Sequence, residues 1–271
     1  MTPEEFFTLL QGELEQNETM HKYYKFHQND ASFYFRKNYF LARLNYIYDL
    51  IKDPNAAIWD CGCGYGTTCL FLAMNGIKTF GTTLEFYFDT IEERKKYWSQ
   101  FGNTDLFSYA YEDLFSEGAY SEKYDVLILQ DTLHHLEPID QALNILNQSL
   151  KPGGILIAIE ENGQNLIQSA KLYKYRGNKR IITIFDEKLQ KDILLGNENI
   201  RSMKHWTRLF EEKNFKIDQS SVQYIRYYLP FMYNAENAAS LFERENLMQR
   251  HSSIRKKYFF FGINFVAKKN N

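Results

Sequence analysis

The sequence lacks the features that would place the protein in a membrane, outside the cell or on nucleic acid. Its 32 basic and 34 acidic residues give a formal net charge of −2, so we expect no nucleic-acid partner. No apolar stretch is long enough to span a bilayer, and no membrane insertion is predicted. Residues 1–7 lack the basic start and apolar run of a signal peptide. We therefore expect a cytoplasmic protein.

Cysteine is also scarce. The three cysteines, Cys61, Cys63 and Cys69, lie close together in the chain. No second cluster of cysteine and histidine follows at the spacing of a zinc site, so no metal is predicted. A disulfide between Cys61 and Cys63 would be strained, which favours free thiols and a reducing compartment. The composition is compatible with a homodimer.

The length of 271 residues suits one α/β domain with additions. Continuous apolar runs at residues 126–129 and 155–159 are typical of strands buried on both faces of a parallel sheet. Predicted helices alternate with these strands, and this order indicates a doubly wound α/β domain. The predicted strands are residues 56–61, 77–82, 106–111, 124–129, 154–160, 215–222 and 258–267.

Two helices are predicted ahead of the first strand. Thr2, Pro3 and Glu5 form a capping box with proline at the first helical position, which predicts a helix to about residue 16. Ser32 is predicted to cap a second helix that ends near residue 51. We assign residues 1–52 to an N-terminal helical extension and residues 53–271 to the main domain.

The main domain is interrupted at about residues 161–202 and 224–250, where the strand and helix alternation breaks. The extension and these two insertions are expected to cap the ligand-binding end of the sheet. Tyr23, Tyr24 and His27 are therefore candidate substrate residues. The alternative is that these rings only pack the extension onto the domain.

A glycine-rich turn joins the first predicted strand to a helix. Gly62, Gly64 and Gly66 allow a sharp bend and the close approach of a ligand to the backbone, which favours a nucleotide-like ligand. The dinucleotide fingerprint has two residues between its second and third glycines. This turn has one, so NAD and FAD are poorer matches. Asp60 closes the strand.

The acidic-x-Gly-x-Gly-x-Gly pattern resembles the first motif of the class I S-adenosylmethionine (SAM) dependent methyltransferases. Further family-like features follow in the expected order, and the resemblance covers residues 56–163 well. It implies SAM as cofactor and a Rossmann-like, seven-stranded sheet whose last strand is antiparallel. The residues that it places near SAM are Asp60, Gly62, Cys63, Gly64, Gly66, Thr83, Glu85, Asp113, Leu114 and Gln130.

Individual roles follow from the resemblance. Glu85 is the candidate ribose ligand, because an ionised carboxylate offers two acceptor oxygens; its alternative is a solvated helix cap. The Gly-x-Thr-Leu sequence around Thr83 is closer to the branch related to cyclopropane fatty acid synthases. Asp113 is expected at the adenine amino group with Leu114 against the ring, and Gln130 beside the methionine portion.

The segment that follows the fourth strand, Gln-Asp-Thr-Leu-His-His, resembles that of small-molecule methyltransferases, including those of quinone and lipid biosynthesis. This resemblance places His134 and His135 near the transferable methyl group. Histidine suits proton removal at neutral pH, although both residues can instead shape the pocket. Glu160 and Asn162 end the fifth strand. They are expected to orient the acceptor or a histidine, or else to cap the next helix.

These features predict a SAM-dependent methyltransferase that acts on a small aromatic or lipid-like metabolite, preferably at oxygen. Aromatic residues form 17% of the chain, which agrees with an apolar chamber or simply with an aromatic core. Metal-assisted methylation would require a cluster such as Asp131, Glu160 and Asn162 and is disfavoured. A SAM-binding protein with an interaction or assembly role and no transferase activity is the main alternative. An NAD-dependent reductase is a weaker one.

Overall fold

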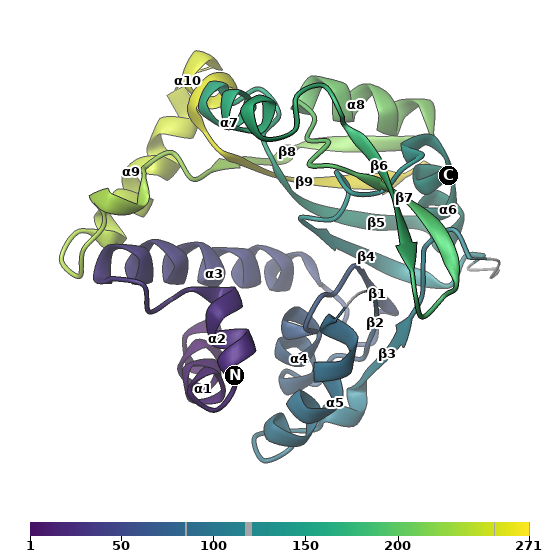
Figure 1. The fold of residues 1–271 in the computed structure, drawn as a ribbon, viewed down its shortest axis with the longest axis horizontal. Coiled ribbons are helices and arrows are strands. Elements are labelled where there is room, and N and C mark those ends of the chain that lie inside the picture. Colours follow the sequence, from purple (N-terminus) through teal and green to yellow (C-terminus); the bar gives the residue numbers. More distant parts are fainter. Residues whose placement is uncertain (85, 117–120, 252, 271) are drawn as a thin grey trace.

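The centre of the computed structural model is a seven-stranded sheet in the order β3-β2-β1-β4-β5-β9-β8 (Figure 1). The structure describes residues 1–84, 86–116, 121–251 and 253–270. Strands β1 to β5 are mutually parallel, whereas β9 pairs antiparallel with β5 and β8. The predicted doubly wound sheet with an antiparallel last strand is confirmed. The bounds are β1 (Ile58–Cys61), β2 (Thr79–Thr83), β3 (Phe107–Tyr111), β4 (Tyr124–Gln130), β5 (Leu150–Glu161), β8 (Phe215–Ile225) and β9 (Gly262–Lys269).

The continuous apolar run of β4 is explained by the position of this strand between two buried clusters. Val126 and Ile128 belong to one buried cluster, and Leu127 and Leu129 belong to the cluster on the opposite face. Successive side chains of a strand point to opposite faces, so a strand between two cores requires an apolar residue at every position. The first cluster includes residues of α4 (Thr67–Met74) and α5 (Tyr87–Trp98), and the second includes residues of α6 (Ile139–Ser149) and α8 (Met203–Glu212).

The N-terminal extension contains three helices, α1 (Pro3–Gln16), α2 (Glu18–Tyr24) and α3 (Asp30–Leu50). Helix α2 was not predicted. It forms because the Asn17 side chain accepts a hydrogen bond from the backbone N–H of Met20 and so caps a new helix directly after α1. Helix α3 begins three residues earlier than predicted, because Asn29 rather than Ser32 is its N-cap. In Figure 1 the helices α1 and α2 lie below α3.

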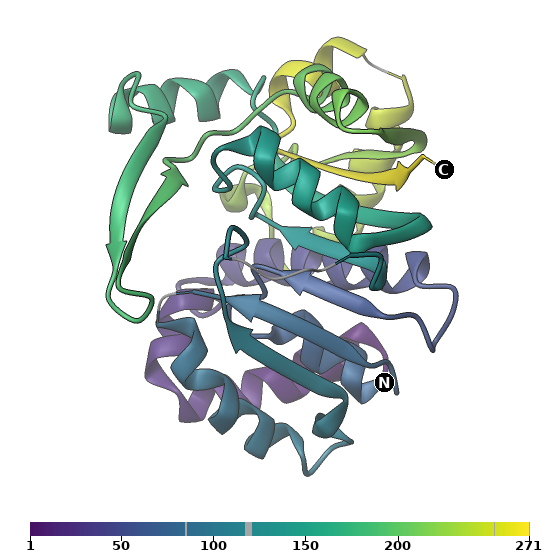
Figure 2. The ribbon, with the colours of Figure 1, turned by 90° about the vertical axis from the view of Figure 1, so that its right-hand side faces the viewer.

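The first insertion contains α7 (Leu166–Arg176) and a separate hairpin of β6 (Ile181–Asp186) and β7 (Lys191–Gly196). Figure 2 shows this hairpin in green, standing apart from the main sheet. The second insertion contains the short turn η2 (Pro230–Met232), α9 (Ala238–His251) and α10 (Ser253–Phe259). Because α10 continues to Phe259, β9 begins at Gly262 rather than at the predicted residue 258. Within the described ranges, no helix has the length and apolar character needed to cross a membrane.

A buried ion pair fixes the extension to the glycine-rich turn. Arg94 on α5 donates to both carboxylate oxygens of Glu13 on α1, at 2.7 Å each. The same guanidinium donates to the carbonyl of Tyr65 and the hydroxyl of Thr67, also at 2.7 Å. Arg94 and Glu13 are 1% and 4% exposed. The extension is therefore tied by charge to the turn between β1 and α4.

Replacement of Glu13 by alanine is expected to destabilise the protein by about 3–5 kcal/mol, because it leaves the buried Arg94 without its counter-charge. Chemical denaturation followed by circular dichroism measures this change. Lys22→Ala is the control, since Lys22 pairs with Glu18 on the exposed surface, and it should leave the midpoint unchanged. A Glu13→Ala midpoint equal to that of the control would contradict the structural role assigned to this ion pair.

Candidate active site

A cavity of about 720 Å³ opens at the carboxyl ends of the parallel strands, a volume within the usual range for small-molecule sites. Residues at or just beyond the ends of all five parallel strands line it, as expected for this type of sheet. One face of α3 and the hairpin β6–β7 complete the walls. The strand-end lining residues include Cys61, Gly62, Thr82, Thr83, Glu112, Asp113, Gln130, Asp131 and Glu161.

The three glycines of the turn serve different purposes. All have positive φ angles, of 82°, 53° and 72°. A Cβ atom on Gly62 would lie 2.5 Å from the Thr132 side chain, and one on Gly66 would lie 2.6 Å from the Phe107 ring. A Cβ on Gly64 would meet nothing within 4 Å, and Gly64 lines the cavity. Gly62 and Gly66 thus allow close packing, whereas Gly64 leaves room for a ligand.

Most other residues predicted near the cofactor also line this part of the cavity: Cys63, Thr83, Asp113, Leu114 and Gln130. The Gln130 side-chain amide donates to the Thr68 hydroxyl at 2.8 Å, which fixes it against the start of α4. The Asp113 carboxylate pairs at 2.8 Å with Lys191 of the hairpin. The adenine end of the predicted site is therefore linked to the first insertion.

Of the predicted cofactor residues that the structure describes, Asp60 and Gly66 are not in the cavity lining. Asp60 is fully buried behind the turn, where its carboxylate accepts from the Cys69 thiol at 3.6 Å. Burial raises the pKa of Asp60 to about 7, because the charged form loses its solvation. This position gives Asp60 a structural role beneath the glycine turn. Glu85, the predicted ribose ligand, lies outside the described residues.

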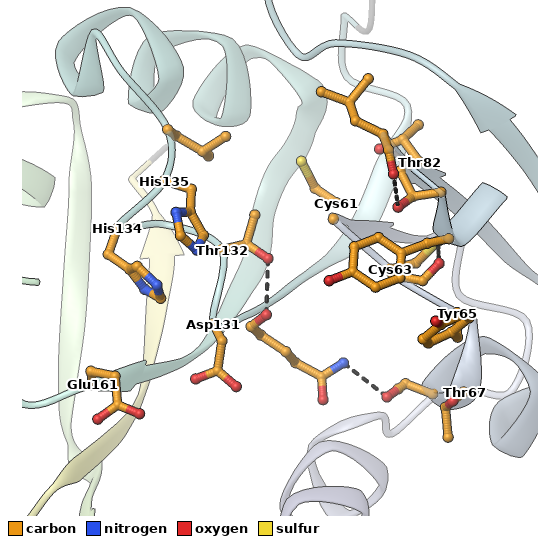
Figure 3. A pocket seen from close by; sticks show the side chains of 18 of the residues that line it. Cys61, Cys63, Tyr65, Thr67, Thr82, Asp131, Thr132, His134, His135 and Glu161 are labelled. Carbon is orange, nitrogen blue, oxygen red and sulfur yellow. Dashed lines mark hydrogen bonds between the residues drawn. The ribbon is translucent and has the colours of Figure 1, made fainter. Parts of the chain in front are cut away.

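The opposite side of the cavity carries two imidazoles, which Figure 3 shows next to one another and across from Cys63, Tyr65 and Thr67. The His134 Nδ1 atom is 2.6 Å from Glu160 Oε2. Glu160 Oε1 accepts from the backbone N–H groups of Thr132 and Leu133 at 3.1 and 2.7 Å. Glu160 is buried and does not line the cavity. It therefore holds the loop and the His134 ring in place.

The two histidines have opposite pKa shifts. Burial opposes the charge on His134, but the adjacent Glu160 carboxylate outweighs it and raises the pKa to about 9. Burial lowers the pKa of His135, and the positive charge of His134 lowers it further. The His135 Nδ1 atom is 2.8 Å from the carbonyl oxygen of Gly196 at the end of the hairpin. The centroids of the two rings are 4.1 Å apart. The His134 ring is held by a residue of β5, and the His135 ring by a residue of β7.

The predicted substrate residues divide into two groups. Tyr23 and Tyr24 line the cavity, and the Tyr24 hydroxyl is hydrogen-bonded to Thr67. His27 does not line it and stacks on His21 with ring centroids 4.9 Å apart. The Asn162 side chain is buried and donates to the carbonyl of Phe260 at 2.9 Å. Asn162 therefore ties β5 to the end of α10 rather than facing the cavity.

Several cavity residues were not predicted. Helix α3 contributes Arg36 and Arg43, which are seven residues apart and so share one helical face. Arg43 pairs with Asp131 at 2.7 Å, and Arg226 of the second insertion pairs with Glu161 at 2.7 Å. The helical spacing was a usable signal for the α3 residues. The contribution of residues beyond the hairpin, such as Glu198, has no local sequence signal.

The cavity fits SAM. Gly64 leaves the open space that a ligand passing close to the backbone requires, and the groups around it are mainly uncharged donors and acceptors. Asp131 lines the cavity, and its Oδ1 atom is buried with no hydrogen-bond partner. A positively charged ligand would satisfy this oxygen, and SAM carries both an ammonium and a sulfonium group.

The sheet order, the antiparallel β9 and the glycine turn beside this cavity define the class I methyltransferase fold. Comparison with known proteins agrees: residues 59–156 match the family model described as a methyltransferase domain. The chain thus contains a methyltransferase domain, and its sheet has the fold of the class I SAM-dependent methyltransferases.

One curated relative is a ubiquinone biosynthesis O-methyltransferase of Mesorhizobium japonicum. It is 31% identical over 135 residues, which cover 45% of this chain and 52% of the relative. The chain therefore matches about half the length of this curated relative. A similar relative, with the same description, is found in Brucella anthropi at 29% identity over 134 residues.

Solved structures of other proteins share the fold over most of this chain. A SAM-dependent methyltransferase from Mesorhizobium loti superposes with a TM-score of 0.53 at 15% identity, covering 84% of this chain and 97% of that chain. The cyclase SpnF gives a TM-score of 0.56 at 18% identity, covering 85% of this chain and 81% of that chain. Likenesses at such identities show the shared fold alone.

Proposed function

We propose that the protein transfers the methyl group of SAM to an oxygen atom of a small, aromatic or lipid-like acceptor. The main support for this proposal is that a single cavity includes both the open space beside Gly64 and the two imidazoles of His134 and His135. A cofactor seated at the glycine turn and an acceptor seated at the histidines would thus share one chamber. The description of the curated relatives as O-methyltransferases favours oxygen as the acceptor atom.

SAM supplies a methyl group on a sulfonium that is already a good leaving group, so the protein chiefly aligns the acceptor and excludes water. The acceptor oxygen forms a bond to the methyl carbon, the methyl–sulfur bond breaks, and its electron pair stays on sulfur. The hydroxyl proton must leave the acceptor, and we propose that it passes to His135, whose lowered pKa leaves the imidazole uncharged. His134 lies beside that oxygen in the proposal, and Glu160 is a positioning residue that holds the His134 ring.

The walls support an apolar acceptor of limited size. On the acceptor side, α3 presents Phe35 and Tyr39, and the hairpin presents Ile184, Ile193 and Leu195. We propose that these side chains keep water from the methyl-transfer path, which would strengthen the polar interactions within the cavity. Tyr23 and Tyr24 close the end nearest the glycine turn, and we propose that they help to separate the chamber from solvent.

The proposed transfer is tested by incubating the purified protein with SAM labelled in its methyl group and a small-molecule extract of the source organism. We expect label in an extractable metabolite that mass spectrometry identifies as a methyl ether. Saturable SAM binding without transfer to any component would favour the alternative of a SAM-binding protein with another role. Calorimetric binding of NAD(H) with no binding of SAM would reject the cofactor assignment itself.

A further inference from the structure

We propose that His134, His135 and Glu198 form a binding site for one divalent transition-metal ion at the acceptor end of the cavity. This inference deepens the proposed methyl transfer and rests on it for the role of the ion, but not for its binding. Each of the three side chains offers one donor atom, and these atoms all lie within 4.8 Å of one another. All three residues line the cavity.

Both imidazole rings are held by their Nδ1 atoms. His134 Nδ1 contacts the Glu160 carboxylate at 2.6 Å, and His135 Nδ1 contacts the Gly196 carbonyl at 2.8 Å. Both partners are hydrogen-bond acceptors, so each Nδ1 carries a proton and each Nε2 is the nitrogen that can bind an ion, which on His134 would replace the second proton that the Glu160 carboxylate favours. A carboxylate or carbonyl behind the ring is the usual arrangement around metal-binding histidines, because it fixes the tautomer and the ring orientation.

Within the described residues, no hydrogen bond is found at the Nε2 atom of His134. Its Nε2 atom is 3.8 Å from Glu198 Oε2, which is too long for a hydrogen bond. Two donors that each lie about 2.0–2.2 Å from a shared ion are roughly 3–4 Å apart. The spacing therefore matches two ligands of one ion, although the His134 side chain is only 3% exposed.

The donor set indicates the class of ion. Two imidazole nitrogens and one carboxylate oxygen suit Zn²⁺, Mn²⁺ or Fe²⁺, whereas Mg²⁺ and Ca²⁺ prefer oxygen ligands. Three protein ligands leave at least one coordination position open, as in catalytic rather than structural sites. Because all three ligands line the cavity, an acceptor hydroxyl there could take the open position and lose its proton to solvent more readily.

The hairpin β6–β7 is essential to this arrangement. Glu198 follows β7 directly, and the Gly196 backbone N–H donates to the His135 carbonyl at 2.8 Å while its own carbonyl contacts the His135 ring. A Cβ at Gly196 would lie 2.0 Å from the His134 carbonyl oxygen, so only glycine allows this approach. These contacts hold the first insertion against the two histidines, and the same insertion contains Glu198, the third proposed ligand.

The test uses isothermal titration calorimetry of ZnCl₂ and, separately, MnCl₂ into protein that has been stripped of metal and saturated with S-adenosylhomocysteine. We expect one saturable site per chain. Glu198→Gln keeps the shape of the half-exposed side chain but removes its charge, and it should weaken binding by about tenfold or more. Glu187→Gln, in the exposed turn of the same hairpin, is the matched control and should bind as the unaltered protein does.

Two outcomes would overturn the metal site. One is the absence of saturable binding of either ion, and the other is equal affinity in the Glu198→Gln and unaltered proteins. S-adenosylhomocysteine affinity, measured in the same variants, should not change. Methyl transfer that persists at full rate after chelation would reject the role of the ion in the reaction while leaving the proposed transferase function intact, so the two hypotheses fail separately.

Discussion

Gly64→Val is expected to weaken SAM binding by more than about 100-fold, a loss of roughly 2.7 kcal/mol in binding free energy. A Cβ at this position meets no protein atom within 4 Å, and the residue lines the cavity beside the start of α4. The branched side chain would therefore occupy the space that we assign to the cofactor. Isothermal titration calorimetry with SAM measures the change directly.

Backbone strain complicates this substitution, because Gly64 has a φ of 53° and valine adopts positive φ angles with difficulty. Gly76→Val provides a matched control. Gly76 also has a positive φ, of 78°, and open space around its Cβ position, but it lies outside the cavity lining. Both variants should melt at lower temperature, yet only Gly64→Val should lose SAM. Equal SAM affinity in the two variants would mean that the site has been misplaced.

The fold was largely predictable because its signals are local. A strand such as β4, with Val126 to Leu129 apolar at each position, must lie between two cores, and the glycine turn is encoded within a few residues. The misjudged boundaries are also local in origin. Asn17 and Asn29 are both helix caps, but an Asn in an aromatic-rich segment is equally typical of a loop, so α2 was not predicted.

The candidate site was predictable only in part, because sequence position does not reveal which way a side chain faces. Glu160 and Asn162 are two residues apart at the end of β5, and both were predicted near the acceptor. The structure turns Glu160 towards the His134 ring, which is one of the roles considered for it, and turns Asn162 away, towards the end of α10. Glu198 could not be found at all, because its proximity to the histidines depends on the folding of a hairpin about 60 residues away in sequence.

His135→Ala is expected to lower kcat by about 100-fold or more while the affinity for SAM changes little. His135 lines the cavity with its Nδ1 atom engaged by the Gly196 carbonyl, whereas the groups around Gly64 that we assign to SAM are untouched by the change. The loss is expected whether the imidazole removes the acceptor proton itself or binds an ion that acidifies the hydroxyl. Steady-state transfer of labelled methyl groups and SAM calorimetry give the two quantities.

His205→Ala serves as the control for this variant, because His205 is an exposed histidine on α8 that lies outside the cavity lining. It should retain full turnover. Three results can then be distinguished for His135→Ala. A lower kcat at constant SAM affinity assigns the ring to the acceptor, and a parallel loss of SAM binding assigns it to the shape of the cofactor site. Unchanged turnover would mean that His135 has only a structural role, which is to hold the hairpin through its contact with Gly196.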